Sequence, residues 1–133
     1  MKNHFKDKVV IVTGASSGIG EATAEEFARN GSKVVLAARS EERLSDIVKS
    51  IRNENGEAIY VKTDVSREED CRNLVKKTVE KYGTIDILVN NAGLSMRANF
   101  LDVDLKVIHR LMDVNFWGTV YCTKYALPYL IQR

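Results

Sequence analysis

Near its N-terminus the sequence reads Val9-Val10-Ile11-Val12-Thr13-Gly14-Ala15-Ser16-Ser17-Gly18-Ile19-Gly20. Its first four residues form a continuous apolar run, which is typical of a strand that is covered on both faces. The glycines that follow allow unusual backbone angles and leave no side chain between the main chain and a ligand. A turn of this kind that opens a helix offers free N–H groups and the positive end of the helix dipole to a pyrophosphate. We therefore predict an anion-binding turn formed by Gly14, Ser16, Ser17, Gly18, Ile19 and Gly20.

Apolar runs and amphipathic segments alternate along the chain beyond this turn. Continuous apolar runs recur at residues 34–38, 58–61 and 85–89, and they predict three further strands. Helical spacing of apolar residues predicts a helix over residues 19–30 and two more around the stripes Leu44-Ile47-Val48-Ile51 and Cys71-Leu74-Val75-Val79-Tyr82. Because strands separated by helices form right-handed βαβ units, the sequence predicts an α/β fold, a doubly wound parallel sheet of four strands with flanking helices.

Several residues predict where the helices begin and end. Gly31 and Gly83 are placed to end the first and third helices, and Ser66 and Glu69 are spaced as a capping box at the start of the third. Residues 104–132 are expected to be mostly helical, with Gly118 and Pro128 as weak points of that helix.

Composition excludes several classes of protein. The chain has 133 residues, 44% hydrophobic and 29% charged, which fits one folded domain. Its 20 Lys and Arg are intermixed with 18 Asp and Glu, so no basic patch favours nucleic acid. No apolar stretch approaches the roughly 20 residues of a membrane span, and we expect no membrane partner. Cys71 and Cys122 are too few for a disulfide scaffold, so we expect both to pack in the core of a cytoplasmic protein.

The spacing of the glycines narrows the choice of ligand. The general dinucleotide fingerprint places glycines at i, i+2 and i+5, whereas Gly14, Gly18 and Gly20 lie at i, i+4 and i+6. The turn is not a P-loop either, because no Gly-Lys-Ser/Thr sequence follows it. The alternative to an anion site is a tight strand-to-helix turn that binds nothing.

Four sequence blocks, in this order and spacing, resemble the classical short-chain dehydrogenase/reductase family. They are Thr13-Gly14-x-x-x-Gly18-Ile19-Gly20, Asp64 after the third apolar run, Asn90-Asn91-Ala92-Gly93 after the fourth, and Asn115. The resemblance extends over almost the whole chain. It implies an oxidoreductase that moves a hydride between a nicotinamide cofactor and a small-molecule carbonyl or secondary alcohol. We accordingly expect residues 1–133 to form one NADP(H)-binding, Rossmann-like domain, the N-terminal half of such an enzyme.

The resemblance also assigns roles to individual residues. It implies that Asp64 holds the adenine amino group, that Val65 lines the adenine ring, and that Asn115 helps a water molecule relay the proton in catalysis. The residues that would lie along the cofactor and brace the sheet are Asn90, Asn91, Ala92 and Gly93. Each role has a structural alternative: Asp64 as a polar strand end, Asn90 as a brace alone, and Asn115 as an amide bonded to a backbone carbonyl.

Arg39 and Ser40, at the end of the second apolar run, bear on which nucleotide binds. An NAD-binding sheet usually has an acidic residue about 20 positions beyond the glycine turn, and here that place holds Ala38, followed by Arg39. A guanidinium would pair with a 2′-phosphate, so we predict NADP(H) over NAD(H). Ser40 is placed either to donate to the same phosphate or to cap the next helix. The alternative for Arg39 is a solvated charge at a strand end.

The family's proton-transfer pair is a Tyr followed four residues later by a Lys, and this pair is absent from the sequence. None of the five tyrosines has a Lys at that spacing, and in Tyr121-Cys122-Thr123-Lys124 the Lys comes one position early. We therefore expect the chain to bind cofactor without turnover and the fold to be truncated before a fifth strand. The fourth strand would then be an open edge, which favours homo-oligomers. A non-catalytic nucleotide-binding or interaction module with the same fold is the alternative, while a methyltransferase-type sheet leaves the block at residues 90–93 unexplained.

Overall fold

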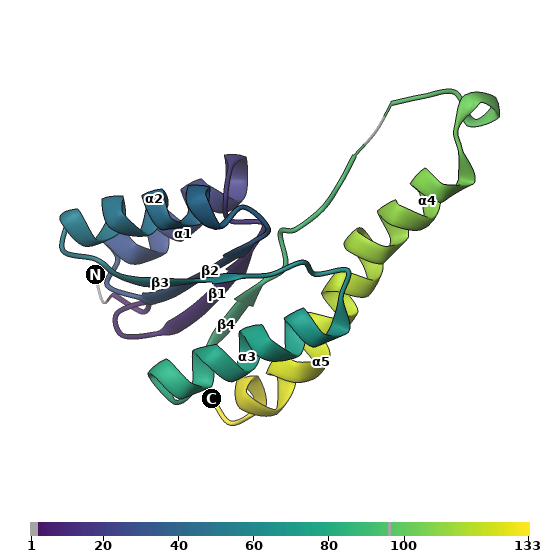
Figure 1. Ribbon diagram of the computed structural model, residues 1–133. Helices are drawn as coiled ribbons and strands as arrows, with labels where there is room; N and C mark the ends of the chain where they lie inside the picture. Colours follow the sequence, from purple (N-terminus) through teal and green to yellow (C-terminus); the bar gives the residue numbers. More distant parts are fainter. Residues whose placement is uncertain (1–2, 96) are drawn as a thin grey trace.

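A computed structural model describes residues 3–95 and 97–133 (Figure 1). Within these residues four parallel strands form one sheet in the order β3-β2-β1-β4; the strands are β1 (Val9–Thr13), β2 (Lys33–Ala38), β3 (Glu57–Lys62) and β4 (Ile87–Val89). Helices α1 (Gly18–Arg29) and α2 (Glu41–Asn53) cover one face, and α3 (Glu68–Tyr82) and α5 (Gly118–Ile131) cover the other (Figure 1). This is the predicted doubly wound α/β fold.

Alternate residues of the strands point into two separate hydrophobic cores. Val10, Val12 and Leu36 face α1 and α2, where they meet the predicted stripe Leu44-Ile47-Val48-Ile51. On the other face, Ile11 and Val35 pack with residues of α3 and α5, including Leu74, Cys71, Cys122 and Ala126. Each fully buried aliphatic side chain contributes about 1.5–3 kcal/mol relative to exposure. The prediction that both cysteines pack in the core is confirmed.

The predicted helix ends are partly confirmed. Gly31 and Gly83 follow the ends of α1 and α3 with left-handed φ of +86° and +81°. The predicted capping box is wrong, because Arg67 is the residue that precedes α3 and its side chain makes no capping bond. Ser66 instead turns back to the end of β3, where its N–H and Oγ both donate to Asp64 Oδ1, at 3.0 and 2.6 Å. The carboxylate thus competes successfully with the helix for the Ser66 hydroxyl.

The late helix is divided at a point that differs from the predicted weak points. Helix α4 (Leu105–Met112) passes through a π-helical segment, Asp113–Trp117, into α5. Gly118 is the first residue of α5, and its bare backbone lies against Val65, since an added Cβ would come within 2.7 Å of Val65 Cγ2. Gly118 therefore permits a close approach of helix to turn, and Pro128 is accommodated inside α5.

Beyond β4 the chain leaves the body of the molecule. The strand is shorter than predicted and pairs with β1 alone among the described residues, so its other edge is open. We call residues 97–112 the arm; it comprises a 3-10 turn, Phe100–Asp102, and α4, and it reaches away from the sheet (Figure 1). None of the helices in the described part of the chain is both long and apolar enough to cross a membrane.

Candidate functional site

A cleft of about 510 Å³ opens at the carboxyl ends of the strands, where ligands bind in doubly wound sheets. Most of the predicted binding residues line it: Gly14, Ser16, Ser17, Gly18, Ile19, Arg39, Ser40, Asp64, Val65, Asn91, Ala92 and Gly93. Segments that lie far apart in the sequence therefore meet at one place. The cleft also includes residues that sequence reasoning missed, namely Ala37, Ala38, Thr63, Leu94, Arg110 and Val114.

The glycine turn packs against the segment that follows β4. Gly14 has φ +62°, and an added Cβ there would lie 2.8 Å from Ala92 Cα. Gly20 lies beneath the turn and outside the cleft lining, where a Cβ would meet Gly14 O at 2.2 Å and Asn91 Nδ2 at 2.5 Å. No heavier residue fits at these two positions without moving the backbone. Gly20 thus allows the turn to pack closely against the first residues of α1 without itself lining the cleft.

Thr13 joins the two segments through one buried hydroxyl. Its Oγ1 accepts from the N–H groups of Asn91 and Ala92, each at 3.0 Å, and donates to Val89 O at 3.4 Å. The Asn91 side chain donates to Gly14 O at 3.1 Å. Asn91 therefore serves as a brace between β4 and the turn. Thr13 was not among the predicted site residues, although the sequence places it directly between the first apolar run and Gly14.

The first turn of α1 borders the cleft through Gly18 and Ile19, and the N–H groups of a helix's first turn have no partner within the helix. Ser17 is its N-cap residue, yet the Ser17 side chain accepts no hydrogen bond from that turn. Gly18 has φ +56°, and an added Cβ would meet nothing within 4 Å, so the backbone there is open to a bound group. Unsatisfied N–H groups and the helix dipole together favour an anion at this place.

Arg39 and Ser40 form the rim of the cleft at the end of β2. Ser40 Oγ accepts from the Arg43 N–H at 3.4 Å. Ser40 therefore caps α2, which is one of the two roles predicted for it. Arg39 is exposed and belongs to none of the ion pairs found among the described residues. Its guanidinium thus remains available to an anionic ligand.

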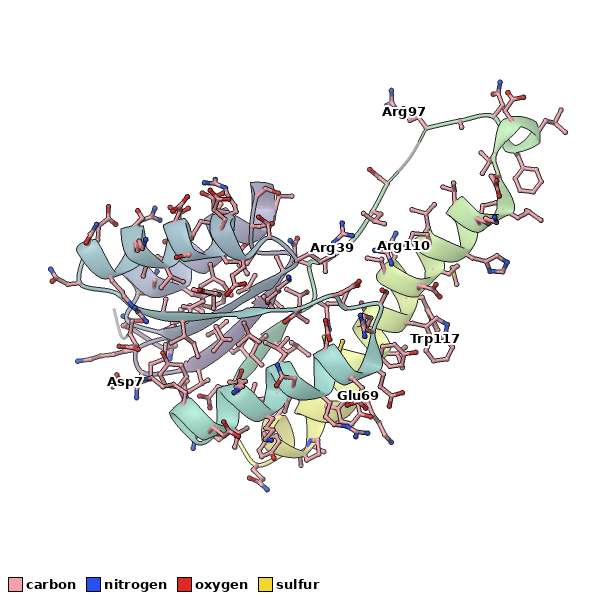
Figure 2. The ribbon with its side chains drawn as sticks, viewed as in Figure 1. Asp7, Arg39, Glu69, Arg97, Arg110 and Trp117 are labelled. Atoms are coloured by element: carbon pink, nitrogen blue, oxygen red, sulfur yellow. The ribbon has the colours of Figure 1, made fainter. Side chains whose placement is uncertain are left out.

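Asp64 lies at the end of β3 as an ionised acceptor. Burial acts to raise the pKa of this carboxyl group, but two hydrogen bonds from Ser66 and the charges of Arg110 and Arg39 outweigh burial and lower the pKa. The Arg110 Nη2 atom stands 4.0 Å from Asp64 Oδ2. Figure 2 shows Arg39 and Arg110 at the junction of sheet and α4, and both line the cleft.

Besides Gly20, two predicted residues lie outside the cleft lining, Asn90 and Asn115. The Asn90 side chain donates to Thr123 Oγ1 on α5, at 3.2 Å. Asn115, in the π-helical segment, accepts from the Leu94 N–H at 2.7 Å and donates to Leu94 O at 2.8 Å. Both side chains thus have structural partners, and the roles of both residues toward a cofactor stay predictions. For Asn115 the backbone carbonyl belongs to Leu94, in the loop after β4.

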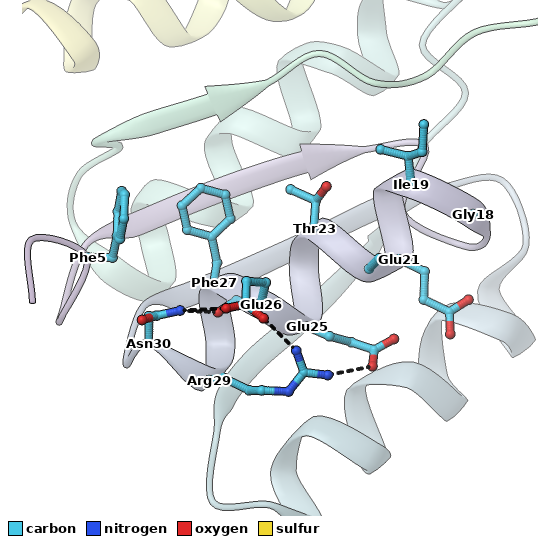
Figure 3. Close-up of a pocket in the computed structure, with 11 residues that line it drawn as sticks. Phe5, Gly18, Ile19, Glu21, Thr23, Glu25, Glu26, Phe27, Arg29 and Asn30 are labelled. Carbon is cyan, nitrogen blue, oxygen red and sulfur yellow. Dashed lines mark hydrogen bonds and ion pairs between the residues drawn. The ribbon is translucent and has the colours of Figure 1, made fainter.

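A larger hollow, of about 740 Å³, runs along the outer face of α1 (Figure 3). Phe5 and Phe27 meet edge to face beside it with ring centroids 5.4 Å apart. Of the predicted binding residues only Gly18 and Ile19 reach its end, and three carboxylates lie along it, those of Glu21, Glu25 and Glu26. Arg29 lines the hollow too and pairs with Glu25 and Glu26, but the carboxylates outnumber it and disfavour phosphate groups, so we place an anionic ligand in the smaller cleft.

Comparisons with known proteins place this chain among dehydrogenase sequences. The family model described as short chain dehydrogenase matches residues 8–133. An 11-beta-hydroxysteroid dehydrogenase A from Sesamum indicum is 46% identical over 125 residues, which are 92% of this chain and 36% of that protein. An uncharacterized oxidoreductase, YxnA, from Bacillus subtilis (strain 168) is 41% identical over 97% of this chain and 36% of its own length. This chain thus spans about a third of the length of these two relatives.

A solved structure gives the same picture. The X-ray structure of an alcohol dehydrogenase from the archaeon Thermococcus sibiricus, complexed with 5-hydroxy-NADP, superposes with a TM-score of 0.91 and 36% sequence identity. The match covers 94% of this chain and 54% of that one. The fold therefore belongs to a known architecture.

Proposed function

The chain belongs to the short-chain dehydrogenase family, a family of oxidoreductases that bind a nicotinamide cofactor, and from that premise we propose that residues 1–133 form an NADP(H)-binding Rossmann domain. The whole protein would reduce a small-molecule carbonyl group or oxidise a secondary alcohol. The observation that carries the proposal is the cleft, which gathers the glycine turn, Arg39 and Asp64 at one end of the sheet.

The residues present fit the parts of a phosphorylated dinucleotide. The free N–H groups at the start of α1 would hold the pyrophosphate, as the open backbone at Gly18 allows. Arg39 would pair with the 2′-phosphate through charge-assisted hydrogen bonds, and Ser40 would donate to the same group. Asp64 would accept from the adenine amino group, with Val65 against the ring. Ala92 and Gly93 would line the path toward the nicotinamide, which supplies or accepts the hydride when bound.

Asn115 would act on the reaction from the π-helical segment. Its amide is held by the backbone of Leu94, directly after Gly93. We propose that it keeps a proton-relay water in place in the whole protein. The 133 residues alone would not turn over, because no Tyr-x-x-x-Lys is present to transfer the proton. Incubating the purified chain with NADPH and a panel of aldehydes and ketones tests this, and any oxidation of NADPH above the protein-free rate would contradict it.

The cofactor preference depends on Arg39. In fluorescence titrations of the full chain, we expect NADPH to bind more tightly than NADH. Arg39→Asp should weaken NADPH about 10- to 100-fold, since a charge-assisted hydrogen bond contributes about 1.5–3 kcal/mol and the new carboxylate repels the phosphate. Arg29→Gln, on the outer face of α1, is the matched control and should leave both affinities unchanged. An Arg39→Asp variant with the same NADPH to NADH ratio would remove Arg39 from the site.

We also propose that the chain self-associates through the open edge of β4. That strand pairs only with β1 within the described residues, and its three apolar residues are half-buried. Unpaired strand edges are templates for pairing with another chain. Light scattering across a concentration series should show a mass that rises above 15.0 kDa, and a monomer at every concentration would contradict the proposal. A cytoplasmic location, drawn from the two free cysteines, stays a prediction.

A further inference from the structure

Besides Arg39, a second cation lines the cleft, and no sequence motif predicted it. Arg110 projects from α4 to the end of β3, where its Nη1 donates to Ser66 Oγ at 3.0 Å. Figure 2 shows its side chain turned back from the arm toward the sheet. Among the residues of α4 none is buried, so this contact is a main tie between the helix and the body of the molecule.

The hydrogen bonds around Ser66 fix the direction of its hydroxyl proton. A guanidinium donates and never accepts, so Ser66 Oγ must be the acceptor toward Arg110. The single hydroxyl proton is then free to be donated to Asp64 Oδ1, and the distance from Ser66 Oγ to Asp64 Oδ1 is 2.6 Å. Arg110 thereby orients Ser66, and Ser66 orients the carboxylate of Asp64.

The two oxygens of Asp64 are left in different states. Oδ1 already accepts from both the N–H and the hydroxyl of Ser66. Among the residues that the structure describes, Oδ2 has only the Arg110 guanidinium nearby, at 4.0 Å, an ion-pair distance too long for a hydrogen bond. A carboxylate oxygen has lone pairs to spare. Oδ2 is therefore the oxygen with capacity for a donor that enters the cleft.

We propose that Arg110 is a positioning residue for base recognition: through Ser66 it holds the Asp64 carboxylate so that Oδ2 accepts from the exocyclic amino group of a bound adenine. This rests on the proposed binding of NADP(H). It gives helix α4, which carries none of the sequence motifs, a part in the selection of adenine. A base with an oxygen in place of the amino group would present an acceptor to an acceptor and be rejected.

Paired ligands test the proposal. NADPH and its hypoxanthine counterpart, which carries a carbonyl oxygen in place of the amino group, are titrated against the full chain and against Arg110→Ala. We expect the unmodified chain to favour NADPH, and Arg110→Ala to weaken NADPH about tenfold while leaving the hypoxanthine form within about twofold, as the loss of one oriented hydrogen bond predicts. The preference between the two bases is a readout that general destabilisation does not move.

Further variants separate the Arg110–Ser66 link from an effect of charge or folding. Ser66→Ala should reduce the preference as Arg110→Ala does, and the double variant should be no worse than either, because the two residues act in series. Lys106→Ala removes a positive charge from the exposed side of the same helix and should leave the preference intact.

Each result has a definite meaning. Equal weakening of both ligands in Arg110→Ala, or an unchanged preference, overturns the role of Arg110 while leaving NADP(H) binding in place. An unmodified chain that binds both ligands equally also overturns it, since Asp64 then does not read the amino group. An unmodified chain that binds neither ligand overturns the proposed function and this inference together.

Discussion

The glycine turn between β1 and α1 and the arm at residues 97–112 are built in opposite ways. Around the turn, space is filled so closely that a methyl group on Gly20 would lie 2.2 Å from a backbone oxygen. Thr13, at 1% exposure, uses its hydroxyl for three hydrogen bonds. On the arm, Phe100 and Leu101 are 76% and 96% exposed, and α4 buries no side chain completely.

This difference shows where the chain's own contacts determine its shape. The turn is specified by interlocking backbone and by a buried hydroxyl, so its geometry exists before a ligand arrives. The arm is tied to the body mainly by Arg110 and by its continuity with the π-helical segment, while the Asp104 side chain that caps α4 at Lys106 N–H lies within the arm itself. Substitutions should therefore have large effects at the turn and small ones along the arm.

Gly20→Ala should have the largest effect. The new methyl group would overlap Gly14 O and Asn91 Nδ2, so the turn must open and both its packing and its anion site are lost. We expect NADPH binding to fall below detection and the melting temperature to drop by roughly 5 °C or more. Ala22→Ser, on the exposed side of the same helix, is the control for both measurements. A Gly20→Ala chain that binds NADPH normally would show that the turn is packed less tightly than the short distances around Gly20 indicate.

Thr13→Val should come next. Valine keeps the shape of the side chain but removes the hydroxyl, which leaves the N–H groups of Asn91 and Ala92 without their acceptor. A buried unsatisfied group costs about 1–3 kcal/mol, and we expect a loss of that size in the free energy of unfolding measured in urea. Thr13→Ser keeps the acceptor and should cost less. If serine and valine destabilise the chain equally, the hydroxyl is not what joins β4 to the turn.

Much of the body follows from local sequence. Continuous apolar runs and helical stripes predict the strands and helices correctly because both faces of the sheet are covered and each pattern repeats within a few residues. The glycine turn, Arg39 and Asp64 converge on the cleft because parallel strands end at the same edge.

The failures occur where residues distant in sequence decide the outcome. Ser66 was expected to cap α3, but Asp64 holds it from one side and Arg110, from a later helix, holds it from the other. The Asn115 amide marked a point where the helix could be disturbed, but the π-helical form of the segment was not predicted, and Gly118 depends on the approach of Val65. Such contacts form only after the chain has folded, so propensity and spacing do not reveal them.

Substitution of Asp86, at the opposite end of the sheet from the glycine turn, should have a smaller effect on stability. Its carboxylate, 3% exposed, accepts from the Val9 N–H at 2.8 Å and from Arg133 Nε at 2.5 Å. Burial acts to raise the pKa of Asp86, but the hydrogen bonds from Val9 and Arg133 outweigh it and lower the pKa.

Because the folded pKa of Asp86 lies below the unfolded value of about 3.9, its contribution is complete above that value and is lost as the pH falls through the folded pKa. Asp86→Asn should cost about 1 kcal/mol at neutral pH and should flatten the decline of stability below about pH 4. Urea unfolding at several pH values measures both effects, with Asp46→Asn on the exposed face of α2 as the control. An acid limb identical to that of the unmodified chain would exclude Asp86 as its source.

Leu101→Ser should have the smallest effect. The side chain lies almost wholly in solvent on the 3-10 turn of the arm, so its replacement removes almost no buried surface. We expect the free energy of unfolding to change by less than about 0.5 kcal/mol and NADPH affinity to be unchanged, whereas Leu36→Ala, in the sheet, should cost about 2–5 kcal/mol. If Leu101→Ser instead destabilises the chain by more than about 1 kcal/mol, the arm must fold against the body or against another copy in solution, and its apolar side chains would then be packed as those around the turn are.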